Sequence, residues 1–129
     1  MRRAGTAIGR VRGLGAAKEG THHWWRQRLT AGLNIALMGW LLLFLARLPG
    51  YDLMTVRMYL SSAWVAIPMA LLIANVFYHF RLGLQVVIED YQHNETRVVL
   101  LVLLNVYVVA LGATAIFSIL RLAFTGTAR

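Results

Sequence analysis

The side chain with the strongest claim to chemistry is His79, which stands in a long apolar segment without a carboxylate partner in that segment. Ionisable groups are costly in the hydrocarbon of a bilayer, so a histidine there faces a cofactor, a polar partner or water. A neutral imidazole nitrogen can ligate haem iron. A hydrogen-bonded structural histidine and a proton-relay group are the alternatives that the residues themselves leave open.

Helical spacing defines the neighbours of His79. At about 100° per residue, four other residues return to nearly the same face of a helix: Asn75, Gly83, Val86 and Asp90. Gly83 leaves a notch one turn away, where a flat cofactor could press against the backbone. Arg81 points elsewhere, and its long stem can carry the guanidinium to a carboxylate, a lipid phosphate or a haem propionate.

A second candidate group ends the same apolar segment. Asp90 and Tyr91 lie about 16 to 18 Å along a helix axis from His79, at a membrane interface. A tyrosine there is commonly a headgroup-level anchor. A phenol beside a carboxylate can also donate a hydrogen bond to a quinone carbonyl and pass protons to water.

The elements that must position these residues are membrane-spanning helices. Apolar residues make up 59% of the 129 residues and charged residues only 14%, which excludes a soluble domain. Three runs are long enough to cross a bilayer, at about 29–46, 64–88 and 98–120. We therefore predict an all-α membrane protein of three transmembrane helices. Asn34 and Asn105 are expected to hydrogen-bond between helices, and a stripe of small residues in the first span is expected to allow close helix packing: Gly32, Ala36 and Gly39.

The basic residues indicate the orientation. Seven of the thirteen Lys and Arg precede residue 29, so residues 1–28 form a basic tail and residues 29–129 a membrane anchor. An inside N-terminus places the tail and Arg97 on the inner side, which gives the N-in, C-out orientation under the positive-inside rule. The tail is Arg-rich like a mitochondrial transit peptide, but it lacks serine and leads directly into a span, so we expect it to be retained. Anionic lipid headgroups explain its charge without a nucleic-acid partner.

Cysteine is absent, so this chain by itself provides no disulfide, iron–sulfur cluster or cysteine-ligated zinc. No Asp or Glu lies inside the predicted spans, which disfavours a small multidrug or ion transporter coupled through an intramembrane carboxylate. A purely structural anchor in which His79 binds no haem is the other alternative.

Two segments carry a resemblance to a known family. Residues 20–31 read Gly-Thr-His-His-Trp-Trp-Arg-Gln-Arg-Leu-Thr-Ala, and residues 78–93 read Tyr-His-Phe-Arg-Leu-Gly-Leu-Gln-Val-Val-Ile-Glu-Asp-Tyr-Gln-His. Together with the three-span layout, they resemble the smaller hydrophobic anchor subunit of succinate dehydrogenase, respiratory complex II, of the alphaproteobacterial and mitochondrial-like type. The resemblance covers nearly the whole chain, and the His-x3-Gly-x6-Asp-Tyr spacing is fairly specific.

The resemblance implies roles for individual residues. It makes His79 an axial ligand of haem b, with Gly83 as the small residue near the haem. It makes Tyr91 a hydrogen-bond partner of ubiquinone, with Asp90 beside it and Arg28 as a basic residue on the quinone side. Less specific candidates for propionate and proton contacts are Arg81, His22 and His23.

The resemblance also implies partners. A companion anchor subunit would supply the second haem ligand, and the two anchors would pack into one haem-binding helical bundle. A flavoprotein subunit holding FAD would oxidise succinate, and an iron–sulfur subunit would pass its electrons to ubiquinone. The chain would be multi-pass in the bacterial inner membrane rather than the mitochondrial one, in contact with lipids.

Overall fold

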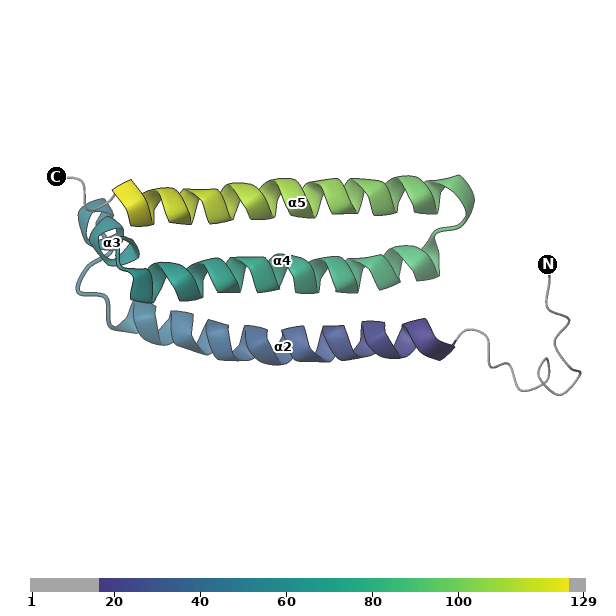
Figure 1. The fold of residues 1–129 in the computed structure, drawn as a ribbon, viewed down its shortest axis with the longest axis horizontal. Helices are drawn as coiled ribbons and strands as arrows, with labels where there is room; N and C mark the ends of the chain where they lie inside the picture. Colours follow the sequence, from purple (N-terminus) through teal and green to yellow (C-terminus); the bar gives the residue numbers. More distant parts are fainter. Residues whose placement is uncertain (1–16, 126–129) are drawn as a thin grey trace, which may run out of the picture.

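The computed structural model describes residues 17–125 and consists of three long helices and one short helix (Figure 1). They are α2 (Ala17–Ala46), α3 (Leu53–Leu60), α4 (Ala63–Tyr91) and α5 (Asn94–Thr125). The long helices alternate in direction, so the start of α2 and the α4–α5 turn lie at one end of the molecule, with α3 at the other. All three long helices are long and apolar enough to span a membrane, which confirms the predicted all-α class and its three spans.

The first helix begins well before the predicted first span. α2 starts at Ala17 rather than at Leu29, and its 30 residues extend for about 45 Å. The hydrocarbon layer is only about 30 Å thick, so α2 continues into the interface on the side of the tail. The predicted division between tail and anchor therefore falls inside a continuous helix, and residues 1–16 of the tail lie outside the described part of the chain.

The connections between helices are shorter than the polar stretches in the sequence. The turn after α2 leads into α3, which begins after Asp52; the Asp52 carboxylate accepts a hydrogen bond from the Thr55 backbone N–H (3.0 Å). Between α4 and α5 only residues 92–93 are non-helical, although residues 89–97 are polar. Asn94 has a φ of 57° at this turn, a backbone conformation that asparagine tolerates better than most residues.

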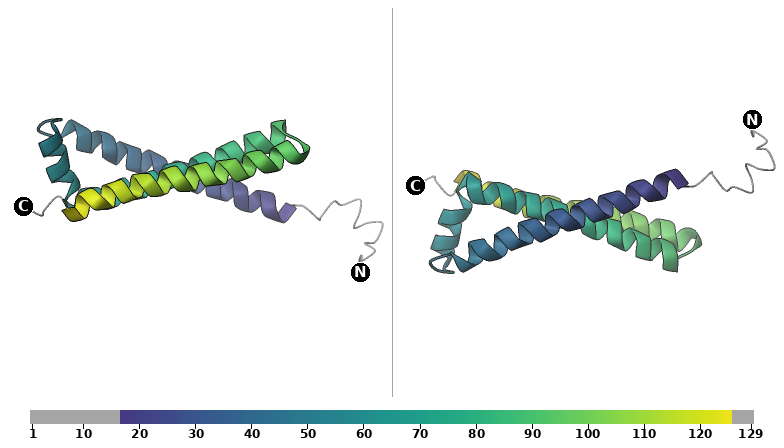
Figure 2. Two further views of the ribbon diagram at one scale, coloured as in Figure 1. Left: turned by 90° about the horizontal axis from the view of Figure 1, so that it is seen from above. Right: turned by 90° about the horizontal axis from the view of Figure 1, so that it is seen from below.

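Helix α4 lies between the other two long helices. It contacts α2 on one side and α5 on the other, whereas α2 and α5 do not touch within the described residues. Figure 2 shows α2 crossing α4 obliquely, while α4 and α5 run side by side. The α2–α4 contact is therefore concentrated where the two helices cross.

The α4–α5 contact is mainly apolar. Its buried residues Ile88, Leu104 and Val108 pack with Phe77 and neighbouring leucines. A Cβ added at Gly112 would lie 3.5 Å from the Phe77 ring, so glycine lets α5 approach that ring closely.

Most other apolar side chains point outward, as expected where lipid or another protein chain covers a helix. The small-residue stripe of the first span does not pack within this chain. A Cβ added at Gly32 or Gly39 would meet nothing within 4 Å. The expected close packing at these glycines is therefore absent from the described residues.

Candidate haem and quinone site

The crossing of α2 and α4 places a polar cluster in the middle of the molecule, comprising Thr30, Asn34, Asn75 and His79. Asn75 Nδ2 donates to Asn34 Oδ1 (2.6 Å) and to the Thr30 backbone carbonyl (2.8 Å). Thr30 and Asn75 are both buried, with 9% of their surface exposed. The predicted interhelical role of Asn34 is thereby confirmed.

His79 is held through one ring nitrogen. Its Nδ1 lies 2.8 Å from Thr30 Oγ1, and no described residue hydrogen-bonds its Nε2. His79 lies about 18 Å from the end of α4 at Tyr91, well inside the span. The structure therefore presents a partly buried imidazole that is oriented from one side and has its second nitrogen available.

The notch expected beside Gly83 is occupied by α2. A Cβ added at Gly83 would lie 3.4 Å from Gln27 Nε2. Gly83 thus allows the Gln27 side chain to approach α4 one turn from His79. Asn75, His79 and Gly83 all face α2, as their helical spacing predicts.

Arg81 points toward the other neighbour of α4. Its Nε donates to Asn105 Oδ1 on α5, and Asn105 Nδ2 donates to the Leu101 backbone carbonyl (2.7 Å). This pair confirms the predicted interhelical role of Asn105. The same pair holds the Arg81 guanidinium against α5, because the Asn105 amide oxygen accepts its Nε–H.

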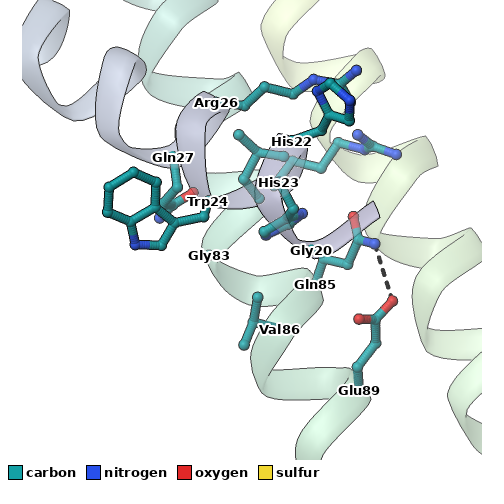
Figure 3. A pocket seen from close by; sticks show the side chains of 12 residues that line it. Gly20, His22, His23, Trp24, Arg26, Gln27, Gly83, Gln85, Val86 and Glu89 are labelled. Carbon is teal, nitrogen blue, oxygen red and sulfur yellow. Dashed lines mark hydrogen bonds between the residues drawn. The ribbon is translucent and has the colours of Figure 1, made fainter. Parts of the chain in front are cut away.

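An open cavity of about 820 Å³ lies between the first turns of α2 and the last turns of α4. Figure 3 shows the side chains that line it. They include the predicted candidates His22, His23, Arg81 and Gly83, together with Trp24, Arg26, Gln27, Gln85 and Glu89. The cavity begins about one helical turn from His79, because Gly83 belongs to its wall.

Some polar atoms in the cavity wall have no hydrogen-bond partner. His23 Nε2 and Gln27 Oε1 are buried without a hydrogen-bond partner. Glu89 accepts a hydrogen bond from Gln85 Nε2 (3.0 Å) and lies 3.7 Å from the Arg97 guanidinium. Buried polar atoms are rarely left unpaired, so these two atoms point to a ligand, a partner chain or water.

The three residues predicted to contact quinone are exposed in this chain. Tyr91 is 77% exposed at the end of α4, and Asp90 beside it is also exposed. Arg28 is exposed on α2, with its guanidinium 5.0 Å from the centre of the Trp24 ring. None of the three lines the cavity.

Comparison with known proteins gives the family. The model of the succinate dehydrogenase/fumarate reductase transmembrane subunit family matches residues 2–115. This chain belongs to that family. It is 37% identical over 84 residues to the succinate dehydrogenase hydrophobic membrane anchor subunit of Rickettsia bellii, covering 65% of this chain and 67% of the relative.

Two further relatives carry similar names. The succinate dehydrogenase membrane anchor subunit of Reclinomonas americana is 37% identical over 93 residues, covering 69% of this chain and 78% of the relative. The succinate dehydrogenase hydrophobic membrane anchor subunit of Paracoccus denitrificans is 27% identical over 110 residues, with 85% of each chain covered. No solved structure matches significantly.

Several polar residues of this succinate dehydrogenase-family chain escaped the sequence reasoning. Thr30 gave no signal, because threonine is a common residue at the start of an apolar run. Gln27 and Gln85 join Gly83 in the cavity wall only because α2 crosses α4 there. The predicted first span began at residue 29, whereas α2 begins at Ala17. Residues 20–27 therefore belong to the same continuous helix as Thr30.

Proposed function

We propose that this chain is the smaller membrane anchor subunit of a succinate dehydrogenase, where it holds haem b with a companion anchor and helps form the ubiquinone-reduction site. The observation that carries the proposal is the imidazole of His79. It lies inside a span, it is oriented through Nδ1 by Thr30, and its Nε2 has no described partner. The chain also belongs to the succinate dehydrogenase/fumarate reductase transmembrane subunit family.

The residues at the crossing fit a haem. No group of three or more metal-ligating side chains occurs among the described residues, which disfavours a metal ion held by this chain alone. Haem iron can be held by histidine side chains from different helices. The sequence has one span histidine, so we propose that the companion anchor would supply the second ligand.

Basic side chains near the crossing suit the propionate groups of a haem. Arg81, Arg26 and the two neighbouring histidines line the cavity that begins one turn from His79. We propose that these side chains receive the propionates, with Arg81 as the principal partner, because guanidinium donors pair well with carboxylates. When bound, haem b would supply a one-electron carrier. The residues of this chain bind and orient it.

The quinone contacts lie closer to the membrane surface. We propose that the Tyr91 hydroxyl donates a hydrogen bond to a quinone carbonyl, while Asp90 exchanges protons with water. Arg28 would be a basic residue on the quinone side. Because these three residues are exposed in this chain, we propose that the iron–sulfur subunit and the companion anchor complete the site.

The remaining parts of the proposal concern assembly. FAD and iron–sulfur clusters belong to the flavoprotein and iron–sulfur subunits, which would sit on the side of the basic tail. The start of α2 and the α4–α5 turn lie at one end of the molecule (Figure 1). The first turns of α2 and α5 contain Arg26, Arg28 and Arg97, so the positive-inside rule favours an inside N-terminus. The relatives in Rickettsia and Paracoccus support a bacterial inner membrane.

The test is His79→Ala in the purified complex. We expect the b-type absorbance to fall at least about tenfold relative to flavin, because even losing a residue behind a ligand costs roughly 10–100-fold. Succinate oxidation with a soluble electron acceptor should remain, since that reaction needs no haem. The matched control is His93→Ala, which removes an exposed histidine from the α4–α5 turn.

An unchanged reduced-minus-oxidised spectrum in the His79→Ala complex would refute the ligand assignment. A wild-type complex without haem would instead favour a structural anchor, with His79 as a packing or proton-transfer group.

A further inference from the structure

We infer that Thr30 is a positioning residue for His79: its hydroxyl accepts a hydrogen bond from Nδ1–H and so directs the Nε2 lone pair toward the iron. The inference rests on the haem ligation proposed above and assigns a role to a second residue of this chain.

The neighbours of the Thr30 hydroxyl favour one direction for the bond to His79. The hydroxyl has one hydrogen and three neighbours: the Arg26 carbonyl at 2.8 Å, the Gln27 carbonyl at 3.1 Å and His79 Nδ1 at 2.8 Å. Both carbonyls can only accept. If the hydroxyl hydrogen serves the helix carbonyls, a lone pair of Oγ1 is left for Nδ1, and Nδ1 must then carry the hydrogen. A neutral imidazole with hydrogen on Nδ1 has its lone pair on Nε2.

The position of Thr30 is itself fixed from α4. Asn75 uses one amide hydrogen for the Thr30 carbonyl and the other for Asn34 Oδ1. The hydroxyl and the imidazole it meets therefore belong to one network across the helix crossing, in which Thr30 and Asn75 are buried and His79 is partly buried. Such a network limits rotation of the His79 ring about its side-chain torsions.

A comparison with Thr114 shows what distinguishes the Thr30 hydroxyl. Thr114 makes the same kind of bond to the carbonyl four residues earlier (2.7 Å), but it is exposed and no cross-helix bond is described for it. The Thr30 hydroxyl lies within hydrogen-bond distance of two carbonyls of its own helix and also meets an imidazole on another helix. Residues that bond the distal nitrogen of a ligating histidine set its tautomer and raise its basicity.

The experiment compares three variants of the assembled complex. Thr30→Val keeps the shape and removes the acceptor, Thr30→Ser keeps the acceptor, and Thr114→Val removes a helix back-bond that touches no histidine. The readouts are haem per flavin, the haem midpoint potential and the electron paramagnetic resonance of the oxidised haem, which senses ligand orientation.

We expect Thr30→Val to weaken haem retention by roughly 10–100-fold. The midpoint potential of the remaining haem should rise, because a less basic imidazole stabilises ferric iron less. Thr30→Ser and Thr114→Val should match the wild type.

Three results would overturn the inference. One is a wild-type potential and resonance spectrum in Thr30→Val; another is an equal shift in Thr30→Ser, which would show that the methyl group matters. The third is loss of assembly in both Thr30→Val and Thr30→Ser, which would make Thr30 a folding residue. If His79→Ala loses haem while Thr30→Val is normal, only this inference fails; if His79→Ala keeps its haem, the proposed function fails first.

Discussion

Within this chain alone, the surroundings of Tyr91 are too open to enclose a quinone. Its side chain is 77% exposed at the last position of α4. A phenol there can anchor the helix in the interface or donate to a ligand supplied at a subunit boundary. Removing only the hydroxyl separates these two roles, because the ring that anchors the helix is kept.

Tyr91→Phe should reduce succinate:ubiquinone activity by about tenfold or more while haem content is unchanged. The reason is that a positioned proton donor contributes roughly 10²–10⁴ to a rate. The measurement is ubiquinone reduction per haem in the purified complex. Tyr107→Phe is the control, since Tyr107 is an exposed tyrosine within the α5 span. Equal turnover in both variants would remove Tyr91 from the quinone site.

At the scale of elements, the length and angle of α2 decide what the site contains. Because α2 extends past the hydrocarbon and crosses α4, its first turns stand opposite the last turns of α4 and form a cavity wall. The same crossing brings Thr30 to His79 in the middle of the span. One helix thus orients the proposed ligand and lines the polar cavity beside it.

The N-terminus of helix α3 is capped by Asp52. The Thr55 backbone N–H donates to the Asp52 carboxylate, and this bond lowers the pKa of Asp52 below its ordinary value of 3.8. A lowered folded-state pKa means that the cap contributes fully above pH 3.8 and is lost as the pH falls below that value through the folded pKa.

Asp52→Ala should therefore speed amide hydrogen exchange at the start of α3 at neutral pH, with haem and activity unchanged. The measurement is exchange at Thr55 in the purified complex. Asp52→Asn is the matched control, because an amide oxygen also caps a helix and does so without a carboxylate to titrate. Equal exchange in the Ala variant and the wild type would show that the cap does not stabilise α3.

The whole molecule is a single layer of helices with most of its apolar surface outward. In the described residues no side chain is fully buried, and only a small core joins α4 to α5. Lipid can cover such a surface, but the unpaired polar atoms of His23 and Gln27 need a hydrogen-bonding neighbour, which hydrocarbon does not provide. This layer is suited to completion by other chains.

Orientation can be tested directly because the chain has no cysteine. We expect His93→Cys, in the α4–α5 turn, to react with a membrane-impermeant maleimide only after the membrane is opened. Pro49→Cys, in the turn before α3, should react from the outer side of intact cells. The reverse pattern would contradict the inside N-terminus, and labelling is read on this chain after electrophoresis.

The sequence by itself determined the class, the number of spans and the residues worth testing. Apolar runs of sufficient length can only be helices in a bilayer, because every backbone polar group must be satisfied within the segment. His79 was conspicuous because ionisable groups are costly there, and helical spacing placed Asn75, His79 and Gly83 on one face. Asn34 and Asn105 were correctly assigned to interhelical bonds.

Only the tertiary structure decided which helix that face meets and at what angle. The crossing of α2 over α4 selected Thr30 as the partner of His79, placed Gln27 against Gly83 and left Gly32 and Gly39 open. Periodicity fixes a direction around one helix axis, but it contains no information about the register or tilt of a neighbouring helix. Those are set by side-chain packing between residues far apart in the chain. The residues proposed to contact quinone, Tyr91, Asp90 and Arg28, remain exposed in this chain.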